Sequence, residues 1–124
     1  MTYLLDTNIV IALTELADER VVRRAEQCVA DEIVTSAIVL AEVALGIARG
    51  SDGEMDRLAA FQEEVPVLDF DTKAALAYAA LPFKRASFDR LIAAHALSLG
   101  LTVVTANEAD FADVPGLKVE NWAV

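Results

Sequence analysis

Short apolar runs alternate along the chain with longer segments in which apolar residues recur at helical spacing. The runs have the length and β-branched content of buried strands. Strands are expected at residues 2–5, 32–36, 65–70 and 101–105, with a fifth, edge strand at residues 117–122. Helices are expected at residues 7–15, 18–30, 37–49, 51–64, 72–81 and 87–99, with a short helical turn within residues 107–116. This alternation predicts an α/β fold: a single domain, residues 1–124, with a central, mainly parallel sheet of four to five strands and helices on both faces.

Polar residues and helix breakers mark the ends of most of the expected helices. The expected N-caps are Thr7 or Asn8, Ser36, a capping box over residues 51–54, and Asp71. The expected stops are Gly50, Pro82 and Gly100. In the helix at residues 18–30, the side expected to face the core carries Val21, Val22, Ala25 and Val29.

Composition adds a strong negative charge to this picture. The chain has a formal net charge of −10, which argues against non-specific capture of nucleic acid, although acids clustered around a cation would produce the same excess. No apolar run reaches the ~18 residues of a membrane span, and the first residues lack a secretory signal, so a cytoplasmic location is expected. The single cysteine, Cys28, is expected to pack.

Three aspartates follow or adjoin the expected strands at one rim of the sheet. Asp6 ends the first strand, Asp110 follows the fourth, and Asp89 opens the helix that leads into the fourth. Ligands of open parallel sheets bind outside the carboxyl ends of the strands. We therefore expect the three carboxylates to lie at the same rim.

Glu42 is the only charged residue of an apolar helical segment, "AIVLAEVALGIA". Helical side chains tilt toward the helix N-terminus, so Glu42 is expected to point back to the same rim. Carboxylates this close must take up protons or bind cations, and oxygen ligands without histidine or cysteine favour Mg²⁺ or Mn²⁺. Such a site can hold one or two ions for phosphodiester cleavage by an activated water.

Each of these acids also has a structural interpretation. Asp6 can cap a helix, and Asp89 is favourable in the first turn of a helix. Asp110 follows Asn107 at nearly the spacing of a capping box, and Glu42 can pair with Arg49 or Arg90. His95, the only histidine, is expected to pack with its helical neighbours rather than to act as a base. The residues expected to support the acids by hydrogen bonds are Thr7, Asn8, Thr105 and Asn107.

The ordered motifs "LLDTN", "SAIVLAEVALGI", "FDRLIAAHAL", "VVTANEADF" and "GLKVENW" resemble a PIN-domain ribonuclease of the VapC toxin family. The resemblance implies a Mg²⁺- or Mn²⁺-dependent endoribonuclease that cleaves structured RNA such as tRNA or rRNA. It implies an acidic quartet of Asp6, Glu42, Asp89 and Asp110. It also implies a homodimer, a VapB-like antitoxin as partner, and a heterotetramer or larger complex with that antitoxin.

Residues 82–87, "PFKRAS", are shorter than the corresponding segment of many family members. Lys84, Arg85 and Arg90 place positive charge near Asp89 and are the candidate RNA-binding residues, although they can also be solvated side chains near a helix start. Two other functions stay open: a non-catalytic PIN-like module that acts through a protein partner, and an aspartyl-phosphate phosphatase or receiver domain. The second is disfavoured because "DTN" lacks a second Asp and no lysine follows the fourth strand.

Overall fold

A five-stranded sheet forms the centre of the protein. The computed structural model describes residues 1–50 and 54–124. The strands are β1 (Tyr3–Leu5), β2 (Ile33–Ser36), β3 (Val67–Leu68), β4 (Thr102–Val104) and β5 (Val119–Glu120). They are hydrogen-bonded in the order β3-β2-β1-β4-β5, and every pair is parallel. The predicted parallel sheet is confirmed, with β4 inside it and β5 at an edge.

The order of winding reverses at β1. The chain adds β2 and β3 on one side of β1 and then β4 and β5 on the other. In register, Leu4 lies between Val34 of β2 and Val103 of β4, and these side chains are at most 1% exposed. The carboxyl ends of β1, β2 and β4 therefore meet where an open α/β sheet usually binds its ligand.

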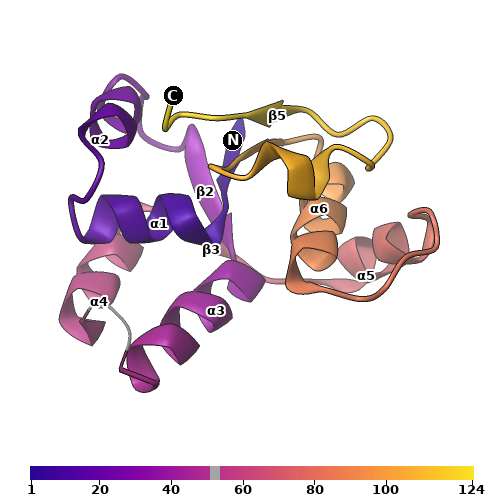
Figure 1. The fold of residues 1–124 in the computed structure, drawn as a ribbon, viewed down its shortest axis with the longest axis horizontal. Coiled ribbons are helices and arrows are strands. Elements are labelled where there is room, and N and C mark those ends of the chain that lie inside the picture. Colours follow the sequence, from indigo (N-terminus) through magenta and orange to yellow (C-terminus); the bar gives the residue numbers. More distant parts are fainter. Residues whose placement is uncertain (51–53) are drawn as a thin grey trace.

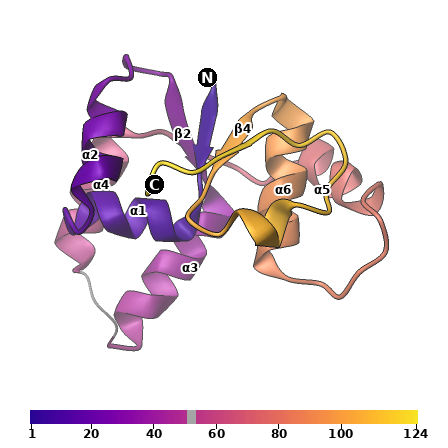
Figure 2. The same cartoon turned by 45° about the horizontal axis from the view of Figure 1, so that its top comes forward.

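Helices cover the sheet on both sides. They are α1 (Thr7–Thr14), α2 (Glu19–Glu26), α3 (Ala37–Ala48), α4 (Met55–Glu64), α5 (Thr72–Ala79) and α6 (Phe88–Leu99), followed by the 3-10 helix η1 (Glu108–Phe111). Figures 1 and 2 show α1, α2 and α4 on one side of the strands and α5 and α6 on the other. No helix of the described residues has both the length and the apolar character needed to cross a membrane.

Capping explains where several helices begin and end. The Ser36 hydroxyl accepts the Ile38 N–H at the start of α3, and the Asp71 carboxylate accepts the Ala74 N–H at the start of α5. Gly100 ends α6 with φ +67°, a left-handed conformation that glycine adopts without steric cost. The predicted capping box at residues 51–54 begins in the part of the chain outside the described residues.

The predicted extent of the second helix is wrong. The segment predicted as helical over residues 18–30 forms only Glu19–Glu26, and Val29, expected in the core, is 73% exposed. Asp18 caps this helix by accepting the N–H groups of Arg20 and Val21. The chain then turns through Asp31, whose φ of +70° is left-handed, to enter β2. The apolar spacing continued past the point where the chain had to reverse direction.

Candidate metal centre

Asp6 stands where β1 passes into α1. Its backbone N–H donates to the Val104 carbonyl at 2.9 Å, which ties the end of β1 to the neighbouring strand. The residue is 4% exposed. Its Oδ2 accepts the Thr105 hydroxyl at 2.8 Å, whereas its buried Oδ1 has no hydrogen-bond partner among the described residues. A buried carboxylate oxygen without a partner is costly unless a proton or a cation compensates it.

Glu42 points from α3 toward the start of α1. Its Oε1 accepts the Thr7 hydroxyl at 2.9 Å, across 35 positions of the sequence. The residue is half-buried. Within the described residues no ion pair joins it to Arg49 or Arg90, the partners of its structural interpretation. The carboxylate of Glu42, the one charged group of this apolar helix, thus lies at the rim of the sheet.

Asp89 completes a compact group of three carboxylates. It lies in the first turn of α6, a helix capped by the Ser87 hydroxyl through the Arg90 N–H at 3.3 Å. One carboxylate oxygen from each of Asp6, Glu42 and Asp89 lies within 4.8 Å of the other two. Three parts of the chain that are far apart in the sequence thereby bring three carboxylate oxygens close together.

Asp110 lies outside this compact group. It is an exposed residue of η1. Among the described residues, the group whose carboxylate oxygens lie close together consists of Asp6, Glu42 and Asp89 and does not include Asp110. Its charge still raises the pKa of both Asp6 and Asp89. The structure thus brings three of the four predicted acids together and leaves the fourth near them at the rim.

Burial and mutual repulsion both act on the three central carboxyls. Burial is the largest cause that raises the pKa of Asp6, of Glu42 and of Asp89. Asp6 and Asp110 raise the pKa of Asp89 further, and Asp89 does the same to Glu42. The hydroxyl groups of Thr105 and Thr7 partly oppose these shifts at Asp6 and Glu42. The group therefore favours a bound proton or a bound cation over three bare charges.

Two threonines orient the carboxylates, and one prediction about them is wrong. The predicted hydrogen bond from Thr105 to Asp6 is present, but Thr7 does not cap α1. That helix begins at Thr7 itself, with Asp6 in the N-cap position, so the Thr7 hydroxyl is free to donate to Glu42. Asn107 supports Thr105 through its backbone N–H, at 3.0 Å from Oγ1.

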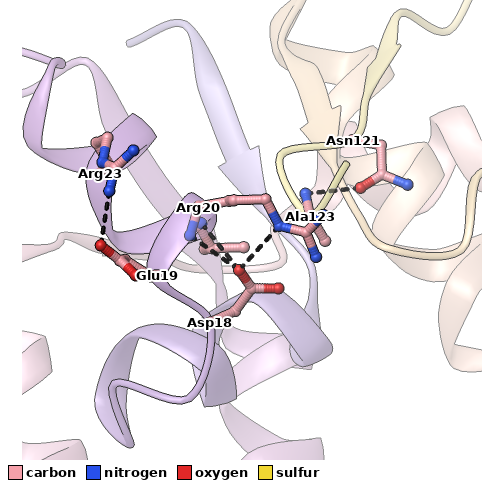
Figure 3. A network of polar contacts seen from close by, with 7 residues as sticks. Asp18, Glu19, Arg20, Arg23, Asn121 and Ala123 are labelled. Carbon is pink, nitrogen blue, oxygen red and sulfur yellow. Dashed lines mark hydrogen bonds and ion pairs between the residues drawn. The ribbon is translucent and has the colours of Figure 1, made fainter.

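Two asparagines hold the turn that follows β4. The Asn8 Oδ1 accepts the Ala106 N–H at 3.1 Å, so Asn8 is not a helix cap either. The Asn121 Nδ2 donates to the Ala106 carbonyl at 3.5 Å, while its Oδ1 accepts the Ala123 N–H at 2.8 Å, which Figure 3 shows. Sequence reasoning missed Asn121. The signal for it was an asparagine directly after an edge strand beside the site.

Arg90 is not available for RNA. The residue is 5% exposed, and its guanidinium donates to the Pro82 carbonyl at 2.6 Å and to Asp113 at 3.3 Å. Successive helical residues point about 100° apart, so a residue beside Asp89 in sequence faces away from it. The prediction that Arg90 binds RNA is therefore wrong, while Lys84 and Arg85 are exposed and stay candidates.

His95 packs in the core, as predicted. It is 1% exposed, its Nδ1 lies 2.7 Å from the Ser36 Oγ, and its ring meets the edge of Phe70 at 5.4 Å between centroids. Burial lowers its pKa. The ring joins α6 to the end of β2, which holds the helix that carries Asp89 against the sheet.

Comparison with known proteins finds similar proteins over nearly the whole chain. The family model of the PIN domain matches residues 3–117. Among curated proteins, the chain is 32% identical to "Ribonuclease VapC2" of Rickettsia felis, with 98% of each chain covered. It is 30% identical to "tRNA(fMet)-specific endonuclease VapC" of Salmonella typhimurium, again with 98% of each covered.

A solved structure has the same fold over nearly its whole length. It is the crystal structure of VapBC2 from Rickettsia felis bound to a DNA fragment from the promoter. The TM-score is 0.85 at 30% sequence identity, and the match covers 98% of this chain and 99% of that one. The likeness therefore includes every element that carries one of the acids.

Proposed function

The chain belongs to the PIN domain family and, within it, to the VapC ribonucleases, and from this we propose that it is a metal-dependent endoribonuclease, the toxin of a type II toxin–antitoxin pair. One observation carries the proposal. Asp6, Glu42 and Asp89 present oxygen atoms within 4.8 Å of one another, and one buried oxygen of Asp6 has no partner among the described residues. Carboxylate oxygens gathered in this way, with one buried oxygen left without a partner, suit a bound divalent cation of the kind that activates water for hydrolysis.

The donor set fits a hard divalent cation. All three groups offer carboxylate oxygen, the ligand of Mg²⁺ and Mn²⁺, and none offers the nitrogen or sulfur typical of zinc sites. The raised pKa values of the three carboxyls also fit, since a cation relieves the same repulsion that a proton does. We propose Mg²⁺ or Mn²⁺, which when bound polarises water and stabilises the leaving oxygen of a phosphodiester.

The residues divide the work by position. Asp6, Asp89 and Asp110 would hold the cation, directly or through water. Glu42, oriented by Thr7, completes the shell or orients the attacking water. Thr105 fixes the carboxylate of Asp6 through one oxygen, which leaves the other for the cation. Water adds to phosphorus while the bond to the leaving oxygen breaks, and no covalent enzyme intermediate forms.

Substrate and partner follow from the relatives. Because a relative is named a tRNA(fMet)-specific endonuclease, we propose structured RNA such as tRNA or rRNA as substrate, and hence a cytoplasmic site of action. The VapBC2 complex supports a VapB-like antitoxin as partner, and we propose in addition that the chain forms a homodimer and a heterotetramer or larger complex with that antitoxin. An antitoxin arginine reaching the carboxylates would form charge-assisted hydrogen bonds that compete with the cation.

The test is cleavage of bulk tRNA by the parent protein, by Asp6→Asn and by the control Asp56→Asn, with Mg²⁺, with Mn²⁺ and with chelator. Asp56 is an exposed acid in the first turn of α4, so its variant makes the same chemical change away from the site. We expect discrete products from the parent and the control, only with metal, and none from Asp6→Asn. Full activity of Asp6→Asn would overturn the assignment, and metal binding without any cleavage would favour a non-catalytic module.

A further inference from the structure

The connection between α5 and α6 exposes an aromatic ring completely. The side chain of Phe83 is 105% exposed relative to a free residue, and Phe88, at the start of α6, is 47% exposed. Figures 1 and 2 show this connection at the outer edge of the molecule, running into the first turn of α6. A fully exposed aromatic ring leaves its faces open to a ligand, and bases of single-stranded nucleic acid stack on such rings.

The segment is held on both sides of the exposed ring. The carbonyl of Pro82 accepts a hydrogen bond from the buried Arg90 at 2.6 Å. Lys84, on the other side of Phe83, pairs with Asp113 at 2.9 Å, and Arg90 reaches the same carboxylate at 3.3 Å. The backbone is thus anchored at residues 82 and 84, and the ring between them projects outward.

The segment that carries the ring leads along the chain into the metal centre. The segment continues through the cap Ser87 into Asp89, whose carboxylate belongs to the compact group. Asp113, which anchors Lys84 and Arg90, lies three residues after Asp110. The exposed ring therefore lies on the segment that leads into Asp89, and this segment is anchored to Asp113, which is close in sequence to Asp110.

Positive charge accompanies the ring. Lys84 and Arg85 follow Phe83 directly, in a chain that has only ten lysines and arginines. Arg85 is exposed and forms no ion pair within residues 1–50 and 54–124. A flat aromatic face next to a free guanidinium suits single-stranded nucleic acid, because bases stack on the ring and phosphates bind the cation.

We propose that Phe83 and Arg85 form a substrate-binding site in which an unpaired RNA base stacks on the Phe83 ring and Arg85 binds a neighbouring phosphate. The inference rests on the proposed ribonuclease function and specifies which form of RNA the site takes: a nucleotide that is unpaired next to the scissile phosphate. Phe83 acts by binding substrate, and the chemistry stays with the carboxylates.

The test compares Phe83→Ala, Phe83→Leu and Phe83→Trp with the control Val29→Ala. Val29 is another exposed apolar residue, three positions beyond the end of α2, a helix that lies on the other side of the strands from α5 and α6. Cleavage of bulk tRNA gives KM and kcat. Binding of a short single-stranded oligoadenylate that contains 2-aminopurine, measured in the non-cleaving Asp6→Asn background, reports stacking through quenching of the base fluorescence.

We expect Phe83→Ala to raise both KM and the Kd for the oligoadenylate about tenfold, within the range of about 5- to 150-fold that loss of one stacked base produces, with kcat within about twofold of the parent. Phe83→Trp should keep the quenching, and Phe83→Leu should lose it although it stays apolar. Arg85→Gln should weaken binding and reduce its salt dependence.

Each contrary result has its own meaning. If the parent cleaves RNA and Phe83→Ala binds, quenches and cleaves like Val29→Ala, this inference is wrong and the ribonuclease function stands. If Phe83→Ala weakens only the complex with the antitoxin, the ring is a protein contact and the inference is again wrong. If the parent neither binds nor cleaves RNA, both proposals fail together.

Discussion

Replacing Asp6 by asparagine is expected to stabilise the metal-free protein while it abolishes RNA cleavage. Asp6 is 4% exposed, and one of its carboxylate oxygens lies within 4.8 Å of a carboxylate oxygen of Glu42 and one of Asp89. Asparagine keeps the shape and can still accept the Thr105 hydroxyl through its amide oxygen. The substitution therefore removes a buried negative charge that destabilises the metal-free protein through desolvation and repulsion.

The magnitude follows from Coulomb's law and its screening. Two unit charges 4.8 Å apart repel by about 3.5 kcal/mol at an effective dielectric of ~20. Glu42 and Asp89 are only half-buried, so solvent and salt reduce this value. Asparagine also loses the favourable interaction of a negative charge with the N-terminus of α1, about 0.3–1 kcal/mol. We expect a net gain of about 1 kcal/mol, or roughly 4 °C in Tm.

The dependence on pH has a definite sign. Burial raises the pKa of Asp6 in the folded protein above its ordinary value of 3.8. Between these two values the folded chain holds more protons than the unfolded chain, so stability falls as pH rises through this window. The contribution of Asp6 to the Tm of the metal-free parent should therefore fall as pH increases above 3.8, so the Tm difference between Asp6→Asn and the parent should shift in favour of the variant.

The assay is thermal unfolding in chelator and with Mg²⁺ or Mn²⁺, with Asp56→Asn as control. In chelator at neutral pH, Asp6→Asn should unfold at the higher temperature. With cation at about 100 times its Kd, the parent gains about 2.7 kcal/mol and should overtake the variant, which loses a ligand. Lower stability of Asp6→Asn in chelator, or an equal gain of both proteins from the cation, would refute the reasoning.

Three further variants test other parts of the account. Burial lowers the pKa of His95 below its ordinary 6.5, so the contribution of His95 to Tm should fall as pH drops below 6.5, and the Tm difference between His95→Gln and the parent should shift in favour of the variant; an unchanged difference would contradict it. Arg90→Ala removes the hydrogen bond to Pro82 and should cost about 2 kcal/mol in urea unfolding, against little change for exposed Arg49→Ala. Thr105→Val removes the hydroxyl that orients Asp6 and should weaken cation binding about 10- to 100-fold by calorimetry without loss of fold; equal affinity would exclude this positioning role.

The sheet was predictable because local pattern and global architecture agree. Apolar β-branched runs such as residues 101–105 form strands only when they are covered, and the intervening helices have the length to cover them. The error at Val29 shows where this reasoning ends. Apolar residues continued at helical spacing past Glu26, although the helix ends there. The chain turns toward β2 at a left-handed Asp31, and no glycine or proline in this part of the sequence indicates that turn.

The position of the site in the fold was predictable from the sequence, whereas several of its hydrogen bonds were not. Strand ends and side-chain tilt were sufficient to bring Asp6, Glu42 and Asp89 together. The hydrogen bonds of Thr7 and Asn8 depended on the helix starting one residue earlier than a Thr7 cap implies and two residues earlier than an Asn8 cap implies. The burial of Arg90 depended on Asp113, 23 positions away, and no local spacing could reveal that partner.

The central claim is that three carboxylates form one divalent-cation site. Anomalous diffraction from crystals of the protein grown with Mn²⁺ tests it most directly, because the signal locates the ion without assuming an activity. The account predicts a peak bounded by Asp6, Glu42 and Asp89 in the parent, and its loss in Asp6→Asn. Crystals that contain Mn²⁺ at other positions but show no peak between these side chains would contradict the account.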